Sequence, residues 1–170
     1  MTAPAREAVP LADDRILRST RVLAAIIVPF LVAAVALLYV LPSRTDELFA
    51  WTIAPSLSAM MLASAYAGGI WFFMQVVFRR GWHTVAAGFP AVILFATLAS
   101  ISTFLHWEKF HFGHISFVTW VVLYVTTPVL VLIVFIRNRR FESRVPAERD
   151  VEMPKVLRYG GSVLGAALAL

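Results

Sequence analysis

Four uncharged apolar runs constrain the fold of this chain more than any other feature. They occupy residues 22–41, 50–78, 85–105 and 115–136, and none of them contains Asp, Glu, Lys or Arg. A helix of about 20 residues, rising about 1.5 Å per residue, crosses the roughly 30 Å hydrocarbon core of a bilayer. Barrel strands are about ten residues long and alternate in polarity, which these runs do not. The pattern therefore predicts an all-α, polytopic transmembrane helix bundle with four spans.

The four spans form one transmembrane domain, residues 22–136, and leave three further segments. Residues 1–21 form a cytoplasmic N-terminal tail, and residues 137–158 form a cytoplasmic basic segment. The short C-terminal segment, 159–170, is apolar, but as a helix its last 11 residues would reach only about 16 Å. We expect it to begin a fifth helix that the chain does not complete; a segment lying at the membrane interface is the alternative.

The basic residues predict the orientation of the bundle. Lys and Arg collect in the cytoplasmic loops of membrane proteins. With the N-terminus in the cytoplasm, only Arg44 and Lys109 fall on the external side. The other 13 of the 15 basic residues are cytoplasmic: Arg6, Arg15, Arg18, Arg21, Arg79, Arg80, Arg137, Arg139, Arg140, Arg144, Arg149, Lys155 and Arg158.

Composition indicates in which membrane the protein resides and which partners it has. Thirteen of the basic residues are arginine, and Ala and Val are abundant, as in proteins of high-GC bacteria. We expect a multi-pass protein of the bacterial cytoplasmic (inner) membrane. The charges sit at the ends of the apolar runs and form no basic stripe, which argues against nucleic acid. The expected partners are the lipid bilayer and either a second copy of the chain or a larger membrane complex.

Small residues indicate how the spans pack, because helices in lipid associate through close contact rather than through hydrophobicity. In the second span, the small residues allow neighbours on more than one side, so we expect this helix to be central; a channel lining is the alternative. Val131 in the fourth span is expected to face lipid. The residues of the small face are Ser56, Ala59, Ala63 and Ala67, with Ser64 and Gly68 beside it, and the third span offers Ala96, Ala99, Ser100 and Thr103.

Every span also contains a proline. We expect Pro55 in the first turn of its helix, where its missing N–H is tolerated. Pro29, Pro90 and Pro128 are expected to be interior and to lie at a similar depth. Interior prolines are common in membrane helices. The alternative is that three kinks at one level open an inward-facing cavity.

Chemically capable side chains concentrate in one external loop. His106, His111 and His114, with Glu108, supply the imidazole and carboxylate groups that Zn²⁺, Cu²⁺ or Ni²⁺ accept. A turn at Gly113 would be needed to bring the three imidazoles together. The alternative is an aromatic belt at the membrane–water interface, where amphipathic side chains such as histidine are also favoured. This is our main interpretation. The belt consists of Trp107, Phe110, Phe112, Phe117 and Trp120.

No other site emerges from the sequence. The spans hold no ionisable acid, base or histidine at mid-membrane, which counts against an ion-coupled transporter or channel acting alone. No phosphate-binding loop, catalytic triad or carboxylate pair can be made from the short loops. We therefore expect a non-enzymatic protein with no cofactor other than the divalent metal considered above.

The aromatic and proline pattern resembles that of small uncharacterised multi-pass membrane proteins of actinobacteria and related bacteria. The resemblance implies the same membrane fold. It implies no activity, because no activity is assigned to that group. The residues that carry it are 49–59, Tyr66, the loop Leu105–His114, Trp120, Tyr124 and Pro128.

Three hypotheses about function follow from the sequence. The leading one is a structural or accessory helix-bundle subunit. The second is a component of a small-molecule transporter with a cavity at the kinks. The third is a membrane-bound metal or pH sensor that uses the external histidines.

The orientation is tested with reporter fusions. Fusions after Phe141 and at Gly81 should report the cytoplasm, and fusions after Arg44 and Gly113 should report the outside, because 13 of the 15 basic residues share one side. A cytoplasmic signal at Gly113 would overturn this topology.

Overall fold

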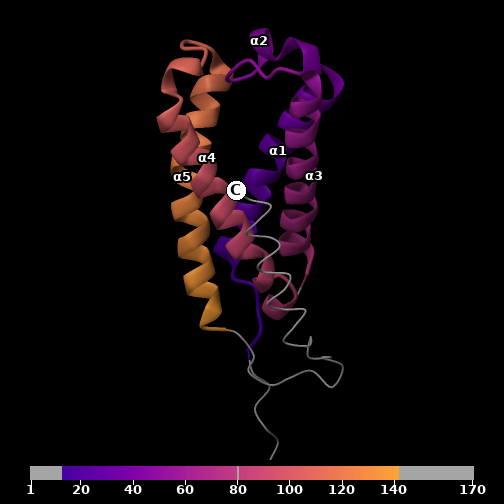
Figure 1. Ribbon diagram of the computed structural model, residues 1–170. Coiled ribbons are helices and arrows are strands. Elements are labelled where there is room, and N and C mark those ends of the chain that lie inside the picture. Colours follow the sequence, from indigo (N-terminus) through magenta and orange to yellow (C-terminus); the bar gives the residue numbers. More distant parts are fainter. Residues whose placement is uncertain (1–12, 80, 142–170) are drawn as a thin grey trace, which may run out of the picture.

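The computed structural model describes residues 13–79 and 81–141, and these residues form an all-α bundle (Figure 1). Four of its helices, counting with α4 the turn before it, are long and apolar enough to cross a membrane. The predicted fold class is thereby confirmed for the described residues, whereas segment 159–170 lies outside them. The long helices are α1 (Arg18–Val40), α3 (Ser56–Phe78), α4 (Phe89–Leu105) and α5 (Ile115–Arg139). The short elements are α2 (Thr45–Leu48) and the 3₁₀ turns η1 (Pro42–Arg44), η2 (Trp82–Thr84), η3 (Ala86–Gly88) and η4 (Trp107–Lys109).

The helix boundaries differ from the apolar runs for local reasons. The second span begins at Ser56 rather than at residue 50, because the residue before a proline avoids helical geometry; Pro55 precedes the helix and is not in its first turn. The third begins at Phe89, so Pro90 lies in its first turn and is not an interior kink. Helical hydrogen bonding also continues beyond the apolar runs, from Arg18 in α1 and to Arg139 in α5.

The bundle consists of two helix pairs. Helix α1 packs along α3, and α4 packs along α5, and α1 also contacts α5. The backbones of α3 and α4 are rarely close within the described residues, although their side chains meet at the ring pairs Tyr66–Phe95 and Phe72–Phe89. In Figure 1, α4 and α5 stand together on the left, and α1 and α3 on the right. The expectation that the second span is central is therefore wrong, because α1 is the helix that joins the two pairs.

A buried amide ties the pairs together where the chain enters α1. Asn138 of α5 is fully buried, and its Oδ1 accepts hydrogen bonds from the Thr20 hydroxyl at 2.7 Å and from the Leu17 N–H at 3.1 Å. Its Nδ2 donates to the Arg15 carbonyl at 3.0 Å. We call this end of the bundle the basic end, since Arg15, Arg18, Arg21 and Arg79 lie there with the arginines that end α5.

The loop between α3 and α4 is also fixed to the N-terminal segment at the basic end. The Trp82 N–H donates to the Asp14 carbonyl at 2.8 Å, and His83 pairs with the Asp14 carboxylate. Arg21 donates from its two terminal nitrogens to the Val77 and Arg79 carbonyls, both at 2.7 Å, and so satisfies carbonyls left free at the end of α3. At the basic end, hydrogen bonds therefore join the N-terminal segment and the start of α1 to the ends of α3 and α5 and to the loop before α4.

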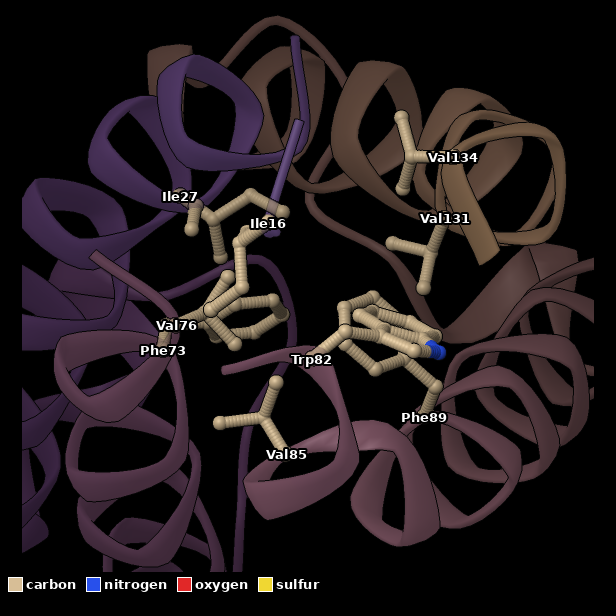
Figure 2. Close-up of a cluster of buried hydrophobic side chains, with 10 residues drawn as sticks. Ile16, Ile27, Phe73, Val76, Trp82, Val85, Phe89, Val131 and Val134 are labelled. Carbon is tan, nitrogen blue, oxygen red and sulfur yellow. The ribbon is translucent and has the colours of Figure 1, made fainter. Parts of the chain in front are cut away.

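An apolar cluster lies directly beneath these bonds. Figure 2 shows Trp82 at its centre, with its indole nitrogen on the side of Phe89 and Val131. Val131 is 0% exposed, so the expectation that it faces lipid is wrong. The indole nitrogen, Nε1, has no hydrogen-bond partner in the described part of the chain. The buried members are Ile16, Ala24, Ile27, Phe73, Val76, Trp82, Val85, Phe89, Val131 and Val134.

The small face predicted for the second span is confirmed in part. Ala59 and Ala63 are buried in the core of the opposite half of the bundle. Ala67 and Ser64 are exposed, and Gly68 faces open space, because these positions point away from α1. In the third span, Ala96 and Thr103 are buried. Close helix contact thus uses a narrower stripe than the sequence suggested.

Substituting leucine on this stripe should disrupt the bundle. Ala63→Leu places a larger side chain where almost no surface is exposed, and overpacking of this kind costs about 1–3 kcal/mol. Ala67→Leu makes the same change one turn away at an exposed position and serves as the control. Thermal unfolding in detergent should show a lower melting temperature for Ala63→Leu only. Equal losses in both variants would mean that the stripe is not an interface.

Candidate functional site

The separation of the two helix pairs leaves two half-enclosed cavities on the side where α3 faces α4, and residues of α1 and α5 also line the basic-end cavity. The basic-end cavity has a volume of about 500 Å³, and the loop-end cavity has a volume of about 650 Å³. Phe95 and Trp120 line both of them, so the cavities adjoin along α4. We call the two together the crevice. Volumes of about 300–1,000 Å³ are typical of small-molecule sites.

The basic-end cavity is lined almost entirely by apolar groups. Small residues keep it open: Gly68 of α3 would meet no atom within 4 Å if it carried a Cβ. The cavity narrows where Gly88, just before α4, faces Phe72 of α3, since a Cβ at Gly88 would clash with the ring of Phe72. Gly88 therefore permits a close approach that no other residue would allow. Lining residues on the opposite walls include Ala65 and Gly68 of α3 and Ala91, Val92 and Phe95 of α4.

Two tyrosines supply the main polar feature of this cavity. The Tyr124 hydroxyl of α5 donates to the Tyr66 hydroxyl of α3 at 2.9 Å, and both side chains line the cavity. The ring of Phe95 lies edge-on to that of Tyr66, at 6.1 Å between centroids. The hydroxyl pair satisfies two polar groups that would otherwise be unpaired in the membrane. It also links the helix pairs at mid-span.

The loop-end cavity has a different rim. Most of its lining is apolar or aromatic and includes Leu62, Leu98 and Trp51. Ser102, His106 and Lys109 line it as well, and all three are exposed. No ion pair or side-chain hydrogen bond involves these three side chains within the described ranges, 13–79 and 81–141. Polar groups thus gather at one end of an otherwise apolar crevice.

The loops tie the helix pairs together at the end opposite the basic end. The His111 N–H donates to the Ala50 carbonyl at 2.9 Å. Its ring nitrogens bond at 3.1 Å to the Phe49 carbonyl and to the Thr52 hydroxyl. Aromatic rings reinforce the contact, with Trp51 lying 4.5 Å from Trp120 and 5.3 Å from Phe110 between centroids. His111 therefore joins the segment before α3 to the loop between α4 and α5.

The predicted metal ligands are brought together only in part. His111 and His114 lie 5.5 Å apart between ring centroids, and the expected turn at Gly113 is present, with φ at +87°. Both ring nitrogens of His111 already bond to protein groups. No group of three or more His, Asp or Glu side chains in the described part of the chain is arranged to hold a metal ion. The metal site at His106, Glu108, His111 and His114 remains a sequence prediction.

Two contributors to this architecture were not apparent from the sequence. Asn138 lies in a run of arginines, and the pattern assigns it to the basic segment, although a lone amide beside an apolar span is a recognisable signal of interhelical bonding. The sequence distinguishes Lys109 only as a charge opposite the basic side. Its position on the cavity rim depends on how the loop folds over α4.

Comparison of the chain with family models, curated proteins and solved structures yields no match. The class of protein is therefore defined by the fold itself: a bundle of four apolar helices with a lateral crevice between two helix pairs.

Proposed function

We propose that the protein is a non-enzymatic accessory component of the bacterial cytoplasmic membrane that binds an apolar chain in the crevice between α3 and α4. In this proposal its N-terminus is cytoplasmic, as the distribution of basic residues favours. The observation that carries the proposal is the pair of adjoining cavities at the depth of the spans, lined mainly by apolar side chains.

The position of the crevice favours a ligand that comes from the lipid phase. Ala65 and Gly68 of α3, and Ala91 and Phe95 of α4, line the cavity and are also exposed on the surface of the bundle. A molecule dissolved in the bilayer can therefore enter sideways. Apolar ligands gain about 0.8 kcal/mol for each methylene group buried away from water, but in lipid this gain is absent. Affinity must then come from shape and close contact, which a preformed crevice provides.

The same geometry gives less support to a transporter component. Three kinks at one level were the basis of that hypothesis, and Pro90 lies in the first turn of α4 rather than inside it. Only Pro29 and Pro128 are interior to described helices. A cavity that holds its ligand is therefore the simpler proposal.

Filling the crevice tests this proposal. At Gly68 an added Cβ meets no atom within 4 Å, so Gly68→Phe can extend its ring into the cavity that Gly68 lines. Ala67→Phe adds the same ring at the adjacent exposed position. The probe is a long-chain fatty alcohol brominated at mid-chain, which quenches nearby tryptophans. The protein is held in nanodiscs of saturated phosphatidylcholine, with Trp71 and Trp107 replaced by phenylalanine, so that Trp51 and Trp120 report from the crevice. Trp82 also remains, but it is buried at the basic end and lines neither cavity, so its fluorescence is a constant background.

Saturable quenching is expected in the parent and in Ala67→Phe. In Gly68→Phe the apparent affinity should fall about tenfold or more, the equivalent of about 1.4 kcal/mol of lost contact. Ala91→Phe, on the opposite wall, should have the same effect and guards against a folding defect of one variant. Quenching that is linear in probe, or equal in all variants, would refute the proposed function.

A further inference from the structure

We propose that the crevice selects an anionic amphiphile, whose carboxylate or phosphate head group binds Lys109 at the loop end while its apolar chain lies in the crevice. This inference rests on the proposed function and names the class of its ligand. It starts from the three polar side chains on the rim of the loop-end cavity, Ser102, His106 and Lys109.

The chemistry of the rim suits an anion. Lys109 carries a full positive charge with three N–H donors, Ser102 offers a hydroxyl donor, and His106 has a ring N–H in either tautomer. Glu108 is the neighbouring residue in the chain, but it does not line the cavity. Hydrogen bonds between charged partners are shorter and stronger than neutral ones. Among the residues that line this cavity, a head group would therefore meet hydrogen-bond donors and no carboxylate.

Lys109 differs from the other basic residue at its end of the bundle. Arg44 binds Glu47 at 2.6 Å, and this hydrogen bond, followed by the charge of Glu47, raises the pKa of Arg44. Lys109 has no ion-pair partner among the described residues. Basic residues are scarce at this end, so an unpaired lysine beside a cavity is not explained by the general distribution of charge.

The geometry of α4 matches a long chain with its head at the interface. Cavity-lining residues run along this side of the bundle from His106 down to Gly88. The 17 residues of α4 between them correspond to about 26 Å, most of the roughly 30 Å hydrocarbon core. Trp51 and Trp120 line the upper part, and tryptophan is favoured where a membrane meets water. An amphiphile lying in the crevice would therefore keep the orientation of a membrane lipid.

The test compares ligands that differ only in the head group. The brominated fatty alcohol is set against the fatty acid with the same brominated chain, at a pH where the carboxylate is ionised, using the same tryptophan quenching. Two variants remove one positive charge each at the same end: Lys109→Gln on the rim and Arg44→Gln outside it. Brominated phosphatidylglycerol and phosphatidylcholine form a second arm that identifies the source of the anion.

The acid should bind the parent protein about fivefold more tightly than the alcohol, the effect expected of one basic side chain near a membrane surface. Lys109→Gln should abolish this difference, and Arg44→Gln should preserve it. A Lys109-dependent preference for phosphatidylglycerol over phosphatidylcholine would assign the head group to a phospholipid; its absence, with the acid preferred, would assign it to a free fatty acid.

Equal binding of acid and alcohol to the parent, or the same loss in both charge variants, would overturn the anionic ligand while leaving the apolar crevice intact. If neither ligand shows saturable quenching that Gly68→Phe weakens, the proposed function itself fails. The two failures are therefore distinguishable.

Discussion

The buried side chain of Asn138 is the interaction on which the arrangement of the two helix pairs depends. Its amide joins the end of α5 to Arg15, Leu17 and Thr20, where the chain enters α1. Removing it would leave a buried hydroxyl and a backbone N–H without an acceptor, and an unsatisfied buried group costs about 1–3 kcal/mol. Hydrophobicity cannot make up for its loss, because lipid is as apolar as a neighbouring helix.

The ties at the two ends explain why the middle of the bundle stays open. At the basic end, Asn138, Arg21 and the Asp14 contacts hold the segments together. At the opposite end, His111 and the rings around Trp120 do the same. Between them the Tyr66–Tyr124 hydrogen bond links α3 to α5, and the described backbones of α3 and α4 are rarely close. Close helix packing in lipid needs small side chains on both facing surfaces. Because α3 packs chiefly along α1, its contacts with α4 are limited to a few aromatic rings.

Much of the fold could be predicted from the sequence, because long uncharged runs leave helices as the only spanning structure. The ends of the helices were harder: Pro55 and Pro90 were both placed inside helices that begin beside them. The pairing of helices was also missed, since Ala63 and Gly68 look alike in sequence and only the structure separates a contact from an open wall. The crevice could not be foreseen, because residues distant in the chain line it and the spacing of their helices cannot be read from the sequence.

The openness of the crevice to the lipid phase is the central claim, and a spin label tests it most directly. The chain has no cysteine, so single labels at Gly68→Cys, Ala67→Cys and Ala63→Cys are free of background. In nanodiscs, the oxygen collision rate at position 68 should approach that at the exposed position 67 and be several times that at the buried position 63. Adding a long-chain fatty alcohol should lower the rate at position 68 alone. A rate at position 68 as low as that at position 63 would show that α3 and α4 close upon each other, and would contradict the account.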